Sequence, residues 1–370
     1  MITQNHSPNL SQNRVLNGTG KEAFELNQFM MREDLRLPSD ILPSRMEFNS
    51  FPENILLTGA TGFLGSHLLQ ELIESTDARI YCLVRSRKKT NGMGRIKKVL
   101  EGYGLWKDEF SEKIIPVEGD IRREGLGLSD LWYEKLSRET GSIYHTAATV
   151  NWVFPYKGLR ESNVMGTERM LRLACENIPK TFNFISSIGV CYASTGPSLV
   201  TEKETMVPFL RDIPLAYAQT KCVSEALVRQ AAERGLFVNI FRPGLISGSS
   251  RSGNSNPDDI FSRVLKACIE MKCAPDLDWI LDYCPVDFVA DTVARFSRDN
   301  GSRSKTFHLL NGKSSHWREC ILWLNFNGYP VQLVSYEGWL DRLRKEINSS
   351  EHALYPLRNF FFRKKSFDAF

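Results

Sequence analysis

The chain has 370 residues, of which 42% are hydrophobic, and a formal net charge of only +4 from 47 Lys and Arg against 43 Asp and Glu. This length supports a sizeable core, either in one large α/β domain or in a domain with a smaller partner. The near balance of charge argues against a nucleic-acid groove and against an acidic solvated tail. No apolar stretch reaches the length of a membrane span or of an export signal.

The first 50 residues are expected to carry no chemistry. Residues 1 to about 22 are rich in Asn, Ser, Gln and Gly and lack periodicity, which predicts a disordered lead. A short helix over Ala23 to Met31 and a Pro-containing linker up to residue 50 are expected to follow. The Met start and this lead favour a free-standing protein over a domain cut from a longer chain.

Residues 55–65 have the sequence ILLTGATGFLG, which combines a short buried strand, a glycine turn and a helix start. Gly59 permits the tight turn, Gly62 lets the backbone approach a pyrophosphate, and Gly65 lets the next helix pack close to the sheet. That helix, expected over Ser66 to Ser75, would hold the phosphates at its N-terminus. Such a glycine triplet also occurs as a plain turn between two core elements, so its interpretation depends on the elements later in the chain.

Apolar strand-like runs alternate with helical stretches from Ile55 onward, which predicts parallel strands joined by right-handed crossovers. The glycine turn follows the first strand, where this fold binds a dinucleotide. We therefore predict an α/β fold with a Rossmann-type doubly wound parallel sheet over residues 51–245. Six strands are expected: Ile55–Thr58, Arg79–Arg85, Ile114–Glu118, Ser142–His145, Thr181–Ser186 and Phe237–Arg242.

Residues 246–370 are expected to form a smaller, mostly α substrate-capping domain, and exchange of a strand between the two domains is left open. This part of the chain contains a helix expected over Ile260 to Met271. The C-terminal stretch ALYPLRNFFFRKKSFDAF combines aromatic with basic residues. It could contact a membrane surface or a carrier protein, but a terminal helix that docks its Phe side chains on the core is favoured.

The second strand ends at Arg85, where dinucleotide folds that select NAD have an acidic residue. A guanidinium there can bind a 2′-phosphate through charge-assisted hydrogen bonds, which favours NADPH. Arg87, Lys88 and Lys89 follow, and the two lysines are expected to belong to a solvated loop. Asp120 ends the third strand, where it can meet the adenine ring, although Asp at a strand end is also a common turn cap.

The small residues after the fourth strand, in His145-Thr146-Ala147-Ala148, would let the backbone lie against the cofactor ribose. His145 could be a general base, but a structural histidine at a strand end is the preferred interpretation. The eight cysteines of the chain are scattered and form no cluster with metal-ligand spacing. They are typical of reduced thiols in a cytoplasmic protein without a metal site.

Tyr217 and Lys221 lie four residues apart on a stretch with clear helical character, so they share one face of a helix. A phenol with a pKa of about 10 is a poor acid or base at neutral pH, but a nearby ammonium stabilises the phenolate. Ser186 or Ser187, at the end of the fifth strand, can hydrogen-bond the same carbonyl oxygen. Three such groups would polarise a C=O beside a nicotinamide, whereas the same spacing without this context is common on exposed helices.

The motifs GATGFLG, YAQTK and RPG, with Ser187, resemble the extended short-chain dehydrogenase/reductases. The fuller set YCLVR, EGDI, AATVNWVFPY, NVMGTERML, RPGLISG and CPVDFV resembles the thioester reductase family. Its members are the terminal reductive-release domains of nonribosomal peptide synthetases, aminoadipate reductases and carboxylic acid reductases. The resemblance extends from about residue 35 to the C-terminus.

This resemblance implies that Ser187, Tyr217 and Lys221 are the catalytic residues. Ser187 is preferred to Ser186 because Val190 follows it by three residues, as in the family pattern. Arg85 and Arg95 match the ligands of the 2′-phosphate. Together with the glycine turn and the strand ends, the residues expected to bind NADPH are Gly59, Thr61, Gly62, Phe63, Leu64, Gly65, Arg85, Arg95, Asp120, Ile121, Ala147, Tyr217, Lys221 and Pro243.

The reaction that the resemblance implies is NADPH-dependent reduction of an acyl or peptidyl thioester on a phosphopantetheine arm to an aldehyde. Reduction onward to a primary alcohol, the acyl group, the oligomeric state and the choice between a carrier protein and coenzyme A are left open. The alternatives are a fatty acyl-CoA reductase, a nucleotide-sugar epimerase or dehydratase, and a non-catalytic NADP-binding protein. The basic end of the second strand counts against the epimerase, and the intact Ser, Tyr and Lys count against the non-catalytic protein.

Overall fold

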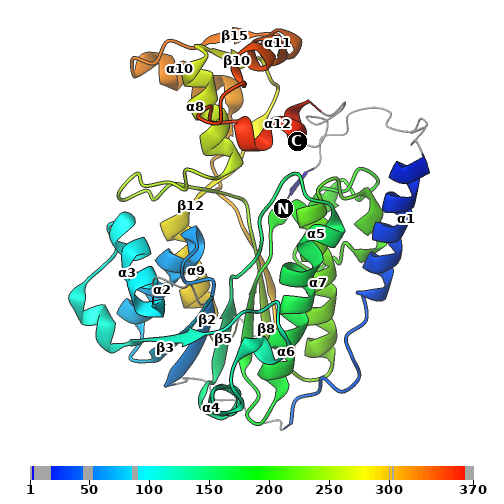
Figure 1. Ribbon diagram of the computed structural model, residues 1–370, viewed down its shortest axis with the longest axis vertical. Helices are drawn as coiled ribbons and strands as arrows, with labels where there is room; N and C mark the ends of the chain where they lie inside the picture. Colours follow the sequence, from blue (N-terminus) through cyan, green and yellow to red (C-terminus); the bar gives the residue numbers. More distant parts are fainter. Residues whose placement is uncertain are drawn as a thin grey trace. The chain divides into compact units, whose positions relative to one another are not determined.

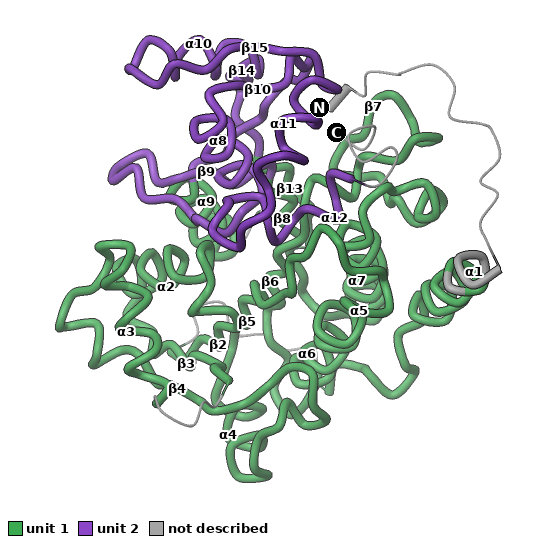
Figure 2. The backbone as a smooth tube through the Cα atoms, turned by 45° about the horizontal axis from the view of Figure 1, so that its top comes forward, with its two compact units in different colours: residues 1–243, 286–309 green, residues 244–285, 310–370 purple. Residues whose placement is uncertain are grey.

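The computed structural model describes residues 2–3, 18–44, 53–85, 91–299, 301 and 304–362. The chain divides into two compact units, residues 1–243 with 286–309 and residues 244–285 with 310–370 (Figure 2). The sequence predicted a domain boundary after residue 245 and left open that a strand from the second domain joins the first. The structure shows this arrangement, because Val286–Leu309 belongs to the first unit.

A seven-stranded sheet in the order β13-β8-β6-β5-β2-β3-β4 forms the centre of the first unit. All neighbouring strands in it are parallel. The residues of β5 and β6 are buried throughout, as expected for strands covered on both faces. The predicted doubly wound parallel sheet is therefore confirmed. Its strands are β2 Asn54–Thr58, β3 Arg79–Val84, β4 Ile114–Glu118, β5 Ser142–His145, β6 Thr181–Ile185, β8 Val238–Pro243 and β13 Thr306–Leu309.

The six predicted strands agree with the structure to within one residue at each end. The seventh strand, β13, was not predicted. It is a short edge strand of sequence TFHL in which only Leu309 is fully buried, so it lacks the apolar run that marks the central strands. It pairs in parallel with β8.

Helices cover both faces of this sheet. The α2 and α9 helices pack on each other, as do α6 and α7, and Figure 1 shows the two groups on opposite faces. The helices of the first unit are α1 Gly18–Glu33, α2 Phe63–Ser75, α3 Gly92–Gly102, α4 Asp130–Glu139, α5 Tyr156–Arg160, α6 Gly166–Cys175, α7 Ala216–Glu233 and α9 Val286–Phe296. Its short elements are β1 Ile2–Thr3, η1 Asp108–Glu112, η2 Glu124–Gly127, the π-helix η3 Glu161–Met165, η4 Ile188–Cys191, β7 Leu199–Val200 and η5 Val207–Asp212.

The expected short helix is present within residues 18–44, but the residues on either side of it are an ordered part of the first unit instead of a disordered lead and a linker. Helix α1 begins at Gly18 rather than Ala23. After it, Asp34 is buried and its carboxylate accepts hydrogen bonds from Arg160 Nε at 2.7 Å and from the Tyr156 hydroxyl at 2.9 Å. These long-range partners cannot be seen in a local composition. Residues 4–17 and 45–52 lie outside the described part.

The second unit contains four helices and three two-stranded ladders in its described residues. Its core includes Trp317, whose Nε1 donates to Pro275 O at 2.7 Å, and Trp339, whose ring lies 5.5 Å from that of Phe361. Phe360 and Phe361 are buried, which confirms the predicted docking of Phe side chains on a core for these two residues, whereas Phe362 is exposed and residues 363–370 lie outside the described part. The elements are β9 Leu245–Ser247, α8 Ile260–Glu270, β10 Cys273–Pro275, β11 Ile280–Leu281, β12 Tyr283–Pro285, β14 Ser315–His316, α10 Trp317–Phe326, β15 Gln332–Val334, α11 Tyr336–Glu346, η7 Tyr355–Leu357 and α12 Arg358–Phe361.

Candidate active site

Two glycines allow the backbone to pack tightly after β2. Gly59 has φ +79°, in the left-handed region, and a Cβ there would lie 2.4 Å from Thr146 Oγ1 and 2.9 Å from Ala147 N. A Cβ at Gly65 would lie 2.0 Å from Gly59 O. Both positions therefore require glycine, and the start of α2 lies directly against the turn, as the motif predicted.

Gly62 is less tightly enclosed. It is exposed, and among the described residues a Cβ there would approach only Gly59 O, at 3.2 Å. Gly62 is also the N-cap of α2, and no side chain of the described residues caps the N–H groups of that helix. Unpaired donors and the positive end of the helix dipole favour an anion, so this turn, with Thr61 and Leu64 half-buried beside it, fits a dinucleotide phosphate. The Phe63 ring turns to that of His67, 5.1 Å away.

His145 at the end of β5 is a structural residue, as preferred from the sequence. It is buried, with Nδ1 2.9 Å from Thr58 Oγ1 and Nε2 3.1 Å from Thr167 Oγ1. Burial, reinforced by the charge of Lys221, lowers the pKa of His145 to about 3. Ala147 N donates to the same Thr58 Oγ1 at 3.2 Å, which joins the loop after β5 to the end of β2. A neutral histidine with both nitrogens engaged is not a general base.

The basic residues after β3 lie beside Asp120. Arg85 is exposed, and the guanidinium of Arg95, on α3, donates to its carbonyl oxygen. The Asp120 carboxylate binds Arg122 through Nε at 3.0 Å and Nη2 at 2.6 Å, and it also accepts from Arg122 N at 3.0 Å. These contacts lower the pKa of Asp120, with a smaller contribution from the charge of Arg85. Asp120 thus caps its own turn, and a role toward adenine stays a prediction. Outside the described residues lie Arg87, Lys88 and Lys89.

Two predicted cofactor residues are apolar and buried. Ile121 packs against Gly166, where a Cβ would lie 3.0 Å from Ile121 Cδ1. Pro243 is the last residue of β8 and pairs with Leu309 of β13. Each can supply an apolar wall beside the carboxyl edge of the sheet, and neither has a polar side-chain atom for a ligand.

The two serines after β6 have different environments. Ser186 is buried and donates to Glu225 Oε1 at 2.5 Å. Ser187 is half-buried, and its Oγ accepts a hydrogen bond from Gly189 N at 3.1 Å. Because that oxygen is the acceptor, the Ser187 hydroxyl keeps its proton for another partner. This difference favours Ser187 as the reacting serine.

Tyr217 and Lys221 lie in the first turns of α7, as their spacing predicted. Lys221 is buried, donates from Nζ to Ile185 O at 2.6 Å, and lies 4.7 Å from the centroid of the Phe184 ring. Burial lowers the pKa of Lys221 to about 7, although the charge of Glu225 opposes the shift. Burial also raises the pKa of Tyr217. The expected lowering of the Tyr217 pKa by Lys221 is therefore wrong for this arrangement, because the lysine directs its nitrogen to the backbone of β6.

The predicted residues thus fall into groups at the carboxyl ends of β2, β3, β4, β5, β6 and β8. Hydrogen bonds join the ends of β2 and β5 through Thr58, and the end of β6 to α7 through Lys221. Since the strands are parallel, their carboxyl ends share one edge of the sheet. The first glycine turn lies between β3 and β5, where the winding of the sheet reverses and dinucleotides bind.

Asn163 is a residue of this region that the sequence analysis did not single out. It lies in the π-helix η3, and its side chain accepts from Thr149 N at 2.8 Å and donates to Thr149 O at 3.1 Å and to Thr220 Oγ1 at 3.0 Å. It thereby joins the loop after β5 to the turn of α7 that carries Tyr217 and Lys221. A π-helix often marks a functional site. In the sequence, however, the only feature that pointed to Asn163 was its position within the motif NVMGTERML.

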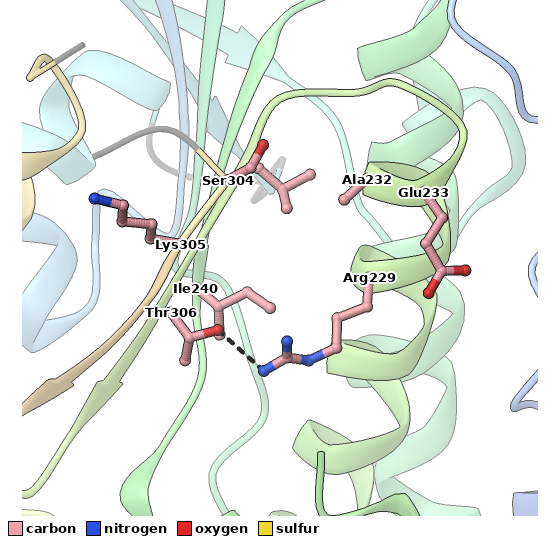
Figure 3. A pocket seen from close by; sticks show the side chains of 8 residues that line it. Arg229, Ala232, Glu233, Ile240, Ser304, Lys305 and Thr306 are labelled. Carbon is pink, nitrogen blue, oxygen red and sulfur yellow. Dashed lines mark hydrogen bonds between the residues drawn. The ribbon is translucent and has the colours of Figure 1, made fainter. Parts of the chain in front are cut away.

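A cavity of about 210 Å³ lies elsewhere in the first unit (Figure 3). Val238 and Thr306, which line it, are the first residues of β8 and β13, whereas the predicted reacting groups follow carboxyl ends. Arg229 Nη2 donates to Thr306 Oγ1 across it at 3.0 Å. The cavity is therefore not part of the candidate active site.

The eight cysteines form no disulfide among the described residues, and only Cys320 is not fully buried. In the ranges that the structure describes, no group of three or more His, Cys, Asp or Glu residues could hold a metal ion. None of the helices described above is long and apolar enough to pass through a bilayer.

Three comparisons agree with this arrangement. An NAD-binding family model, described as male sterility protein, matches residues 57–293. A linear gramicidin synthase chain of Brevibacillus parabrevis is 36% identical over 83% of this chain, and L-2-aminoadipate reductase large subunit of Candida glabrata is 33% identical over 82%. The chain spans only 6% and 24% of the lengths of these two relatives.

Among solved structures, the terminal R domain from the myxalamid PKS-NRPS biosynthetic pathway is similar over nearly its whole length. It aligns with a TM-score of 0.83 and 39% identity, over 89% of this chain and 85% of that domain. The first unit is therefore an NAD(P)-binding domain. The chain belongs to the terminal reductase domains of nonribosomal peptide synthetases, within the extended short-chain dehydrogenase/reductases.

Proposed function

We propose that this chain reduces an acyl or peptidyl thioester, held on the phosphopantetheine arm of a carrier protein or on coenzyme A, to an aldehyde with NADPH. The observation that carries the proposal is the junction of β6 with α7. There Ser187 lies two residues after Ile185, whose carbonyl oxygen accepts from Lys221, and Tyr217 lies one helical turn before that lysine. The glycine turn lies at the same edge of the sheet.

Each residue of this group has a chemical role that its environment supports. Bound NADPH would supply the hydride that converts the thioester carbonyl into a tetrahedral alkoxide. Ser187 would donate a hydrogen bond to the alkoxide oxygen, since its own oxygen already accepts from Gly189 N. Tyr217 would transfer its proton to that oxygen, because a raised pKa keeps the phenol protonated at neutral pH. The thiohemiacetal then loses its thiol, which takes the hydroxyl proton, and the aldehyde remains.

Lys221 would orient the cofactor. Its ammonium has three hydrogens, and the structure shows one of them donated to Ile185 O. The remaining capacity suits the hydroxyl groups of a ribose beside the α7 helix. The positive charge near the reacting carbonyl would also favour an alkoxide.

The choice of NADPH over NADH rests on Arg85 and Arg95. The Arg95 guanidinium, on α3, reaches the carbonyl oxygen of Arg85, which brings it to the end of β3 where Arg85 lies. A 2′-phosphate is a dianion that two guanidinium groups bind well. Asp120, one strand away, has its carboxylate engaged by Arg122 and does not compete for them.

The direct test is to mix the purified chain with acyl-phosphopantetheine and acyl-CoA thioesters of several chain lengths and to follow NADPH oxidation, with mass spectrometry of the products. We expect aldehyde or alcohol to form. Replacement of Tyr217→Phe should lower kcat on the order of a hundredfold or more, whereas Tyr133→Phe, which removes a phenol on α4, should not. NADPH that stays unoxidised with every thioester would exclude the proposed function.

The cofactor assignment is tested separately by Arg85→Glu. We expect the KM for NADPH to rise on the order of tenfold to a hundredfold, with little change for NADH, because a charge-assisted contact to the 2′-phosphate is lost. Arg79→Glu is the matched control, since Arg79 is an exposed arginine at the other end of the same strand. Equal effects of Arg85→Glu on both cofactors would show that this residue does not read the 2′-phosphate.

A further inference from the structure

A buried guanidinium lies directly behind the junction of β6 and α7. Arg242 of β8 is fully buried, and its five N–H donors all have partners. Nε and Nη2 donate to the two oxygens of Glu225 at 2.9 and 2.6 Å, and Nη2 also donates to Glu204 O at 3.2 Å. Nη1 donates to His308 Nε2 at 3.1 Å and to Cys191 Sγ at 3.7 Å. One side chain of β8 thus contacts four other segments of the first unit.

The neutral state of His308 agrees with this pattern. Burial and the charge of Arg242 lower the pKa of His308 to about 4, so its Nε2 accepts from the guanidinium rather than competing with it. The pair formed by Arg242 and Glu225 is bidentate, the geometry that leaves a carboxylate least freedom to rotate. The Glu225 carboxylate is therefore held in one orientation from behind.

The same carboxylate reaches forward to β6. Glu225 Oε1 accepts from Ser186 Oγ at 2.5 Å, and Lys221, one turn earlier on α7, donates to Ile185 O at 2.6 Å. Two consecutive residues at the end of β6 are thus attached to two consecutive turns of α7. The next residue of the chain is Ser187, and the preceding turn of the helix carries Tyr217.

We propose that Ser186 and Glu225 are positioning residues, which with Arg242 set the separation between the Ser187 hydroxyl and the Tyr217 phenol. This rests on the proposed function only in that it assigns Ser187 and Tyr217 to the reaction. Neither Ser186 nor Glu225 touches the substrate, because both are buried behind the reacting pair. Loss of their contact removes one of the two attachments and lets the end of β6 move relative to α7.

Ser186→Ala is the sharpest variant, because it removes one hydrogen bond and leaves the pair of Arg242 and Glu225 intact. We expect kcat for thioester reduction to fall on the order of tenfold while the KM for NADPH stays within about twofold, since misplacement of about 1 Å at a reacting group is costly. Ser142→Ala is the matched control. Ser142 is another buried serine with a hydrogen bond to a neighbouring strand, to Thr181 O at 3.3 Å, but it lies at the amino end of the sheet.

Crystal structures of the wild type and both variants give a measurement that does not need catalysis. We expect the distance from Ser187 Oγ to Tyr217 Oη to change on the order of 1 Å in Ser186→Ala and to be unchanged in Ser142→Ala. An unchanged distance in Ser186→Ala, or a kcat within twofold of the wild type, would overturn the proposal. If the wild type reduces no thioester, the proposed function has failed, and the distance alone decides the positioning role.

A second variant tests whether the two residues act through one contact. Glu225→Gln should lower kcat at least as much as Ser186→Ala, and the double variant should lose no more than Glu225→Gln alone. Losses that multiply in the double variant would show that Ser186 and Glu225 act independently, which contradicts the proposal. Kinetic constants are taken per folded molecule, measured by near-UV circular dichroism.

Discussion

Strand β6 has a buried lysine at each end, and the two differ in how their hydrogens are used. Lys180 precedes the strand, and its Nζ donates to three carbonyl oxygens, those of Ser137 at 2.8 Å, Glu176 at 2.9 Å and Ile178 at 2.6 Å. Lys221 meets the last residue of the strand, where Nζ donates to Ile185 O. Among the described residues, this carbonyl is its single hydrogen-bond partner.

Burial and pKa do not separate these two lysines. Both are almost completely buried, and burial lowers the pKa of each to about 7. A count of donors does separate them, because an ammonium has three hydrogens and Lys180 has placed all three. A lysine whose ammonium hydrogens are not all bonded to protein acceptors can bind a ligand at the edge of the sheet, whereas one with all three bonded is structural. A lowered pKa alone does not distinguish the two.

The largest expected effect is that of Lys221→Met, which keeps the length of the side chain and removes its charge. We expect kcat/KM for thioester reduction to fall on the order of a hundredfold or more, because the ribose and the alkoxide lose a cation. The melting temperature should stay close to that of the wild type, since a buried charge with one partner is removed. A fall in stability without loss of kcat/KM would show that Lys221 is the structural lysine and does not serve the reaction.

Lys180→Met should have the opposite result. Three carbonyl oxygens would lose their donor, and we expect the free energy of unfolding to fall by about 2–3 kcal/mol, measured by urea denaturation. Activity per folded molecule should be unchanged, because the proposed reacting groups lie at the carboxyl end of β6 and Lys180 lies at its amino end. Loss of kcat in a fully folded Lys180→Met protein would mean that this lysine also serves the reaction.

The smallest expected effect is a dependence of cofactor binding on pH. The pKa of Lys221 is lowered from 10.5 to about 7, so the ammonium predominates below that pH and is lost as the pH rises through it. We expect the Kd of NADPH, measured by fluorescence, to rise about tenfold between about pH 6 and pH 8, because binding weakens as the charge is lost. The dependence should vanish in Lys221→Met and persist in Lys180→Met. A Kd that is flat over this range in the wild type would show that the charge of Lys221 does not contribute to binding.

The sequence predicted the central sheet, and the placing of Tyr217 and Lys221 on one helix, because both depend on local patterns. Buried parallel strands are continuous apolar runs, a glycine turn has a fixed spacing, and Tyr217 and Lys221 are neighbours on any helix. The edge strand β13 has no such run, and the segment after helix α1 is held by partners such as Arg160 that lie far along the chain.

Long-range contacts explain the other differences. The hydrogen bond from Lys221 to Ile185 O spans 36 positions, so the sequence could not show that the lysine turns toward β6 and leaves the Tyr217 pKa raised. The same holds for Arg242 and His308, 66 positions apart. These contacts depend on which strands are neighbours in the sheet. The strand β13, which carries His308, was not predicted from the sequence.

The pairing of β13 with β8 has a consequence for how the protein is made. The ribosome completes β8 at Pro243, but its neighbour Thr306–Leu309 is translated only after the entire segment 244–305. During that interval the nascent β8 presents an open row of N–H and C=O groups, and Arg242 lacks His308. Chaperone binding or fast translation over this segment would therefore protect the chain from edge-to-edge aggregation.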